Sequence, residues 1–152
     1  MINFLYKTSL YSYAILLLSG CGSSRESQDL DEQIAWAGKQ CYAYEQGGNM
    51  VTLNATFTNG VVYGNLDYQW AEKDQNRGMI EGKMNGDTLI ANYTFQSEGT
   101  QSVRQVAFIF DEKTAREGYG ESSMNGNMMV FNNPSHLTFS DDMVLQKVDC
   151  PE

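Results

Sequence analysis

The chain has 152 residues, with 19 acidic and 10 basic side chains and a formal net charge of −9. This length predicts one domain. The acidic surplus argues against binding to nucleic acid and against charge-driven binding to anionic lipid. It suits either a basic protein partner or solubility alone.

The beginning of the chain has the pattern of an export signal. Lys7 precedes the apolar run 10–18, which is short for a transmembrane helix of roughly 20 residues. The segment Leu18-Ser19-Gly20-Cys21 resembles the lipobox of bacterial lipoproteins. This resemblance implies that residues 1–20 are removed as a signal peptide and that Cys21 carries the lipid. An ordinary signal peptide with a cysteine there by chance is the alternative.

The resemblance also implies a location. Two or three acyl chains on one cysteine are enough for stable anchoring. Gly22, rather than an aspartate, follows the cysteine, and in lipoproteins of bacteria with two membranes this permits transport to the outer membrane. The small and acidic residues that follow predict a flexible tether, so that 21–35 form the lipidated N-terminus and tether and 36–152 form the domain.

The two remaining cysteines, Cys41 and Cys150, predict a disulfide, because an even pair in an exported chain is typical of one. They bracket nearly all the expected strands. Closing a loop of about 100 residues contributes about 4–5 kcal/mol in the simple chain-entropy model. A metal or redox site would need a CxxC motif or histidine partners, and the sequence has neither.

From residue 40 onward apolar and polar residues alternate with a period of two, which predicts β-strands. Asn-Gly pairs at 59–60, 85–86 and 125–126 predict tight turns between them. The expected strands are 40–46, 51–57, 62–70, 78–84, 89–95, 104–110, a short one at 116–121, 128–131 and 143–148, with a short extended piece at 137–139 and a charged loop at 71–77.

About eight strands joined by tight turns, with no long helix, predict an all-β fold: an up-and-down antiparallel meander that closes into a barrel. A bond between Cys41 in the first strand and Cys150 beyond the last would bring the two edges of the sheet together. The turn spacing and the strand glycines resemble calycin-type barrels, the lipocalin and avidin group, although the Gly-x-Trp opening motif of lipocalins is absent. The segments 93–99 and 102–106 resemble small bacterial lipoproteins of unassigned function, which imply no activity.

Arg104 is the most informative charged residue. Strand parity places it inside the barrel with Val106 and Phe108, and a buried guanidinium needs acceptors. Two interpretations stay open: an ion pair with Glu98 or Glu117 that closes one mouth of the barrel, or a group that recognises an anion at the base of a pocket.

Aromatic residues are abundant and would either pack the core or line a cavity for a hydrophobic ligand with a polar head. The candidate ligand-binding residues are Arg104, Tyr93, Glu117 and Tyr119, and the other aromatic candidates for the interior are Tyr42, Tyr44, Tyr68 and Trp70. The only histidine, His136, is expected at the surface. Met124, Met128 and Met129 could suggest a soft-metal site, but Met128 and Met129 are expected on opposite faces of one strand.

The sequence thus predicts a non-enzymatic, lipid-anchored β-barrel of the bacterial cell envelope that is structural or binds a small hydrophobic or amphiphilic ligand. No catalytic residue, metal site or cofactor is predicted, because no phosphate loop, HExxH or GxSxG motif is present. The alternative is a module that binds or inhibits a basic protein. Membrane-bound lysozyme inhibitors are also small lipoprotein barrels with a disulfide, but their loop motifs are not found in this chain.

Overall fold

The computed structural model describes residues 36–71 and 75–152. Three sequence predictions lie outside these residues: the signal peptide 1–20, the lipidated Cys21 and the tether 21–35. No helix in the described ranges is long and apolar enough to cross a membrane.

Strands make up most of the described chain. They are β1 (Gly38–Gln46), β2 (Asn49–Thr58), β3 (Val61–Gln69), β4 (Asn76–Asn85), β5 (Thr88–Ser97), β6 (Thr100–Phe110), β7 (Thr114–Tyr119), β8 (Ser122–Asn125), β9 (Met128–Phe131) and β10 (Thr138–Val148), with one 3₁₀ turn, η1 (Pro134–His136), before β10.

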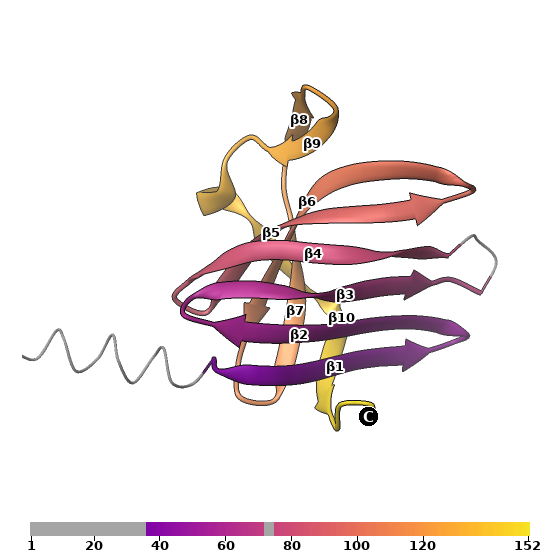
Figure 1. Cartoon of the computed structure of the whole chain (residues 1–152), viewed down its shortest axis with the longest axis vertical. Helices are drawn as coiled ribbons and strands as arrows, with labels where there is room; N and C mark the ends of the chain where they lie inside the picture. Colours follow the sequence, from indigo (N-terminus) through magenta and orange to yellow (C-terminus); the bar gives the residue numbers. More distant parts are fainter. Residues whose placement is uncertain (1–35, 72–74) are drawn as a thin grey trace, which may run out of the picture.

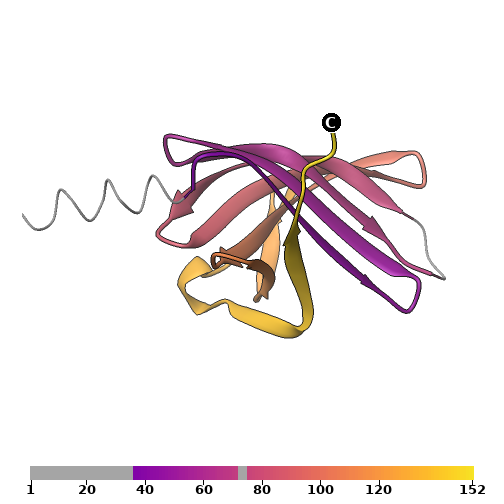
Figure 2. The same cartoon turned by 90° about the horizontal axis from the view of Figure 1, so that it is seen from below.

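Eight of these strands close into a barrel. Strands β1 to β7 pair consecutively and antiparallel, and β10 pairs with both β7 and β1, so the ring has no open edge. In Figure 1, β1 to β5 run across the front while β7 and β10 cross behind them, and Figure 2 shows the same barrel from below. The predicted all-β fold, an antiparallel meander closed into a barrel, is confirmed.

The tight turns lie where the Asn-Gly pairs predict them. Gly60, Gly86 and Gly126 each have a positive φ, between 63° and 75°, which glycine adopts without the steric cost that a Cβ brings. The turn at 98–99 likewise joins β5 to β6, with Glu98 itself at φ 51°. These turns set the register of each hairpin and thereby the face to which each side chain points.

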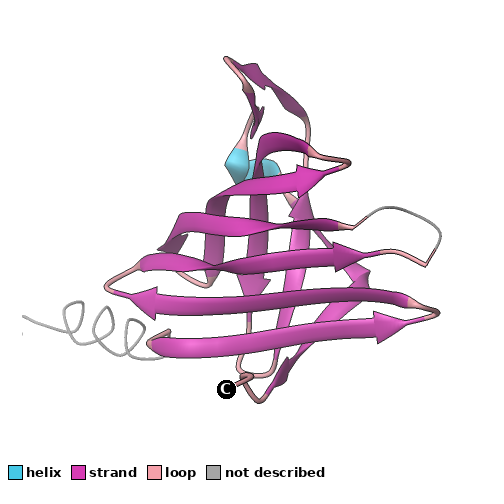
Figure 3. Ribbon diagram, turned by 45° about the vertical axis from the view of Figure 1, so that its right-hand side comes forward, coloured by secondary structure: helices cyan, strands magenta, loops and turns pink. Residues whose placement is uncertain are grey.

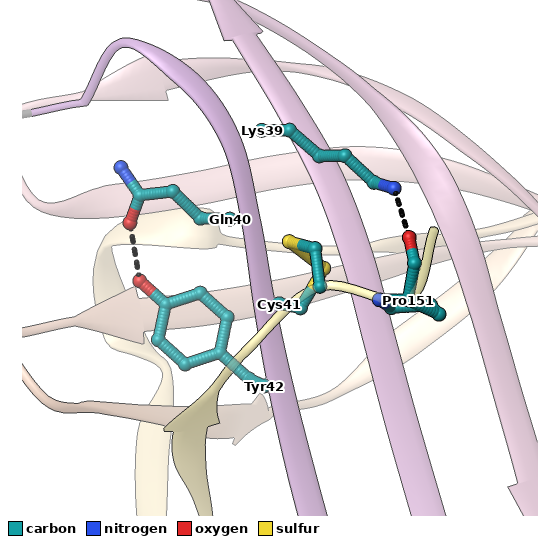
Figure 4. The surroundings of a disulfide bond; sticks show 6 residues. Lys39, Gln40, Cys41, Tyr42 and Pro151 are labelled. Atoms are coloured by element: carbon teal, nitrogen blue, oxygen red, sulfur yellow. Dashed lines mark hydrogen bonds between the residues drawn. A yellow bond between two sulfur atoms is a disulfide. The ribbon is translucent and has the colours of Figure 1, made fainter.

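The predicted disulfide is present. Cys41 in β1 and Cys150 just beyond β10 are bonded, with their Cα atoms 5.2 Å apart, and Cys41 is opposite Val148 in the register of the two strands. Close to the disulfide, the Lys39 ammonium donates a hydrogen bond of 2.9 Å to the Pro151 carbonyl (Figure 4). The first and last strands of the barrel are therefore joined covalently as well as by their ladder.

Two expectations about the C-terminal strands need correction. The extended piece at 137–139 and the last strand at 143–148 belong to one strand, β10, whose pairing with β7 shifts register between Phe139 and Val144. Such an irregularity bends a strand without ending it, and the polar residues at the bend made one strand look like two. Strand β7 also starts earlier than expected, at Thr114, because Asp111 caps the preceding turn.

The hairpin of β8 and β9 lies outside the ring of eight. Strand β9 pairs with β6 in parallel, through Val103 opposite Met128 and Arg104 opposite Met129, and β8 pairs only with β9. Figures 1 and 3 show this hairpin rising from the barrel beside β6. This parallel contact is an exception to the predicted antiparallel pattern, and it places the hairpin at one end of the barrel.

The barrel interior is filled by the apolar residues that alternate along the strands. Inward glycines help the sheet to curl: a Cβ at Gly64 or Gly78 would clash with the backbone of the neighbouring strand, at the carbonyl oxygens of Asn54 and Thr94. The two ends of the interior differ. We call them the closed end, where β2 ends and β3 begins, and the open end, where β3 ends and β6 begins.

Candidate functional site

The closed end is sealed by aromatic rings. Trp36, which precedes β1, has its ring centroid 6.0 Å from that of Phe57 and 5.4 Å from that of Phe110. Phe57 and Phe110 pack edge to face at 5.5 Å, and Phe110 also contacts Tyr42 at 5.3 Å. These rings leave the open end as the place to look for a ligand site.

The open end contains a hollow of about 360 Å³, within the size range of small-molecule sites. Its wall is built by β3, β4, β6, β7 and the β8–β9 hairpin. The lining residues are Tyr68, Trp70, Asn76, Arg104, Gln105, Val106, Glu117, Gly118, Tyr119, Gly120, Ser122, Met129 and Phe131. The hollow therefore combines aromatic rings with two charged side chains.

Arg104 is on the inner face of β6, as strand parity predicts, and it lines this hollow. Its Cζ lies 5.5 Å from the ring centroid of Tyr68, 5.7 Å from that of Tyr93 and 5.5 Å from that of Phe95. Cation–π contacts of this kind stabilise a partly desolvated guanidinium. They supply no oxygen acceptor, however, and the Nε atom of Arg104 is buried without a hydrogen-bond partner.

Glu117 on β7 is the buried acid of the site, with 5% of its surface exposed. Its Oε1 accepts a hydrogen bond of 2.7 Å from the Tyr68 hydroxyl, and its Oε2 accepts one of 3.1 Å from the Tyr119 hydroxyl. Burial raises the pKa of the Glu117 carboxyl, although the two hydroxyls and the charge of Arg104 act in the opposite direction.

The ion pair with Glu117, one of the two alternatives considered for Arg104, is not formed. The one salt bridge among the described residues is at the surface, between Arg116 and Asp141 at 2.9 Å. The carboxyl of Glu117 is instead held by two tyrosine hydroxyls. The charge of Arg104 is close enough to favour the ionised acid but makes no direct contact with it. The guanidinium consequently keeps its capacity to bind another group.

Tyr93 does not line the hollow. It is fully buried beneath Arg104, stacked on Phe95 at 4.8 Å and edge to face with Tyr68 at 5.9 Å. Its hydroxyl is buried without a hydrogen-bond partner. Of the four candidate ligand-binding residues, Arg104, Glu117 and Tyr119 are brought together at the hollow, and Tyr93 supports Arg104 from below.

Sequence reasoning missed the part of the wall that comes from the hairpin. Met129 and Phe131 line the hollow, and the Phe131 amide donates a hydrogen bond of 3.0 Å to Oε1 of Gln105, which fixes β9 against β6. No periodic signal could have placed these residues, because a four-residue strand can pair with many partners.

Of the remaining sequence candidates, Tyr68, Trp70 and Met129 also line the hollow. His136 is exposed in η1, as expected. Met124 and Met129 are cross-strand partners on the hairpin. The described ranges contain no group of three or more histidine, cysteine, aspartate or glutamate side chains that could hold a metal ion.

The open end thus brings a half-buried guanidinium, a carboxyl held by two hydroxyls and several aromatic rings together around one hollow. Comparison of the chain with protein-family models, with curated proteins and with solved structures found no match.

Proposed function

We propose that the protein is a non-enzymatic, lipid-anchored β-barrel of the bacterial cell envelope that binds a small ligand at the open end of its barrel. The observation that carries the ligand site is Arg104, whose Nε is buried without a partner at a hollow of about 360 Å³. An unsatisfied buried donor costs about 1–3 kcal/mol. The other N–H groups of this guanidinium are not buried in the same way, so a ligand oxygen in the hollow would pair with them.

The support for the anchor comes from the N-terminal sequence. Leu18-Ser19-Gly20-Cys21 resembles a lipobox, and Gly22 suits transport to the outer membrane. The predicted tether 21–35 would then hold the barrel near the membrane surface, where amphiphilic ligands are concentrated. The intact mass of the protein purified from its bacterial host tests this anchor. A mass lacking residues 1–20 and carrying acyl chains supports it, and a Cys21→Ser variant should lose both features.

Native mass spectrometry of the same purified protein tests ligand binding. We expect a bound small molecule that is released on collisional activation. An Arg104→Met variant that still folds should retain less of it. Protein that is uniformly empty, with the Trp70 fluorescence of a Trp36→Phe variant unaffected by added lipid extract, would contradict a ligand site at this end.

The alternative function, binding or inhibition of a basic protein, is supported by the acidic surplus of the chain. Residues at the open end also remain exposed to a partner, among them Tyr119 with 48% of its surface exposed. Lysozyme activity measured with excess mature protein tests its most specific version. Inhibition that Tyr119→Ala weakens would favour the alternative over the ligand site.

A further inference from the structure

Two hollows meet at Arg104. Beside the hollow described above, a second one of about 490 Å³ lies between the end of β5, the start of β6 and the β8–β9 hairpin. Arg104 and Met129 line both hollows. A ligand that pairs with the guanidinium can therefore extend in either direction, and the lining of each hollow indicates which part of the ligand it would accept.

The guanidinium end of the site suits an anion. Three aromatic rings surround the Arg104 Cζ at 5.5–5.7 Å, and its Nε is buried without a partner. The nearby acid, Glu117, is already held by the hydroxyls of Tyr68 and Tyr119. Carboxylate and phosphate oxygens match the fixed fork of guanidinium N–H donors better than neutral acceptors do.

The second hollow suits an apolar chain. Its lining includes the apolar residues Phe95, Val103, Met124 and Met129, next to the neutral polar residues Gln101, Ser102 and Asn127, and no acidic side chain lines it. Met124 keeps 60% of its surface exposed, although it is apolar. Methionine side chains are flexible and adapt to irregular apolar ligands. A chain lying here would cover methionine surface that is otherwise in contact with water.

The charge pattern of the hairpin agrees with this assignment. Residues 122–140 contain no aspartate, glutamate, lysine or arginine, although the whole chain carries a net charge of −9. An anionic ligand approaching along this segment meets less repulsion than it would over the rest of the acidic surface. The one formal charge exposed to both hollows is that of Arg104.

We infer that the ligand of the open end is an anionic amphiphile, whose carboxylate or phosphate head pairs with Arg104 and whose apolar chain lies between Phe95 and Met124. This inference rests on the proposed ligand-binding function and specifies its ligand class. The shared chemistry is one anionic head on one flexible chain, so a free fatty acid and a phosphorylated lipid fragment both qualify.

The experiment compares probes with the same chain and different heads. The mature chain, residues 21–152 with Cys21→Ser, is titrated below micellar concentrations with dodecanoate, dodecyl phosphate, dodecanol and dodecyltrimethylammonium, and binding is followed by calorimetry. We expect the two anions to bind at least about ten-fold more tightly than the alcohol, and the cation to bind most weakly. The ratio of the dodecanoate and dodecyl phosphate affinities then shows whether the site prefers a carboxylate, as in a fatty acid, or a phosphate, as in a phosphorylated lipid fragment.

The Arg104→Gln variant should lose that preference, reducing anion affinity about ten-fold while leaving dodecanol unchanged. Arg77→Gln is the matched control, because Arg77 is an exposed arginine on β4. It should bind all four probes like the parent. If Arg104→Gln and Arg77→Gln bind the anions equally well, the assignment of the head group is wrong even though ligand binding stands. If no probe binds the parent, the proposed ligand-binding function is itself contradicted.

A second variant tests the chain without disturbing the interior. Met124→Ser changes an exposed residue of β8, so the barrel should fold as before. It should weaken dodecanoate more than octanoate, because the longer chain reaches farther over the methionines. Equal weakening of both, or none, would overturn the placement of the chain between Phe95 and Met124.

Discussion

The two ends of the barrel are built from the same strands but have opposite character. At the closed end Trp36, Phe57 and Phe110 fill the interior with rings. At the open end Arg104 and Glu117 lie among rings, next to a hollow. The difference shows that the alternation of a strand sets only which face a residue occupies. The identity of the inward residues along the strand decides whether an end is packed or available.

Strand β6 contains this contrast within one segment. Its inward residues run Arg104, Val106, Phe108 and Phe110 from the open end to the closed end. The last three are at most 3% exposed, whereas Arg104 is only partly buried. Stability and binding should therefore respond to substitutions at different ends of the same strand.

Truncation at the closed end should have the largest effect on stability. Phe110→Ala removes a ring that contacts Trp36, Tyr42, Phe57 and Phe108. We expect the free energy of unfolding to fall by about 3–5 kcal/mol, measured by denaturant titration. Ligand affinity of the folded fraction should stay close to that of the parent. A loss below 1 kcal/mol would mean that the closed end is not the stabilising one.

Removing the disulfide should come next. The double variant Cys41→Ala, Cys150→Ala removes a cross-link between residues 109 positions apart. We expect a loss of about 2–4 kcal/mol, because disulfides typically contribute less than the chain-entropy model gives. Because Cys41 pairs opposite Val148 near the closed end, the open end should keep its ligand affinity in the folded state. Reduction of the parent with dithiothreitol should reproduce the same loss. An unchanged unfolding midpoint after confirmed reduction would contradict the account.

Much of this contrast follows from the sequence. The period of two placed Arg104 inside with Val106 and Phe108, and the Asn-Gly pairs indicated the turns. The cysteine count predicted the bond that joins the first and last strands. These features depend on residues that are close in the sequence, on strand alternation or on the number of cysteines, so they can be predicted from one sequence.

What could not be read depends on contacts between distant segments. Glu117 is held by Tyr68, which is 49 residues away in the sequence, and strand patterns gave no reason to prefer this partner over Arg104. The parallel pairing of β9 with β6 likewise consists of only two residue pairs, one of which places Met129 opposite Arg104. Both contacts depend on how the closed ring brings its far sides together, which alternation does not encode.

At the open end, Tyr68→Phe should cost less than either change above. It removes the hydroxyl that donates a hydrogen bond of 2.7 Å to Glu117. The buried carboxyl then keeps only the hydrogen bond from the Tyr119 hydroxyl. We expect a loss of about 1–3 kcal/mol at neutral pH by denaturant titration. Tyr44→Phe is the matched control, since its hydroxyl donates to Gln46 in an exposed pair, and it should change stability by less than about 0.5 kcal/mol. Equal losses of stability in the two variants would contradict the claim that the hydrogen bond from Tyr68 to the buried Glu117 stabilises the fold.

Glu117→Gln should change the free energy of unfolding least. The change should depend on pH, so it is measured by denaturant titration over a series of pH values. Burial raises the pKa of Glu117 above its ordinary value, against the influence of Tyr68, Arg104 and Tyr119. The folded state therefore holds this proton more tightly than the unfolded chain does. The resulting stability is fully present below the unfolded pKa and is lost as pH rises through the folded pKa.

The glutamine variant keeps an amide in place of the carboxyl and has no such titration. The difference in free energy of unfolding, parent minus variant, should thus decrease from acidic to neutral pH and then level off. Subtraction cancels the contribution of Asp111, whose pKa is lowered by its hydrogen bonds with Thr114 and Lys113 and which is unchanged in both proteins. A difference that grows with pH would show that the tyrosine hydroxyls and Arg104 outweigh burial, and that the open end favours the ionised acid.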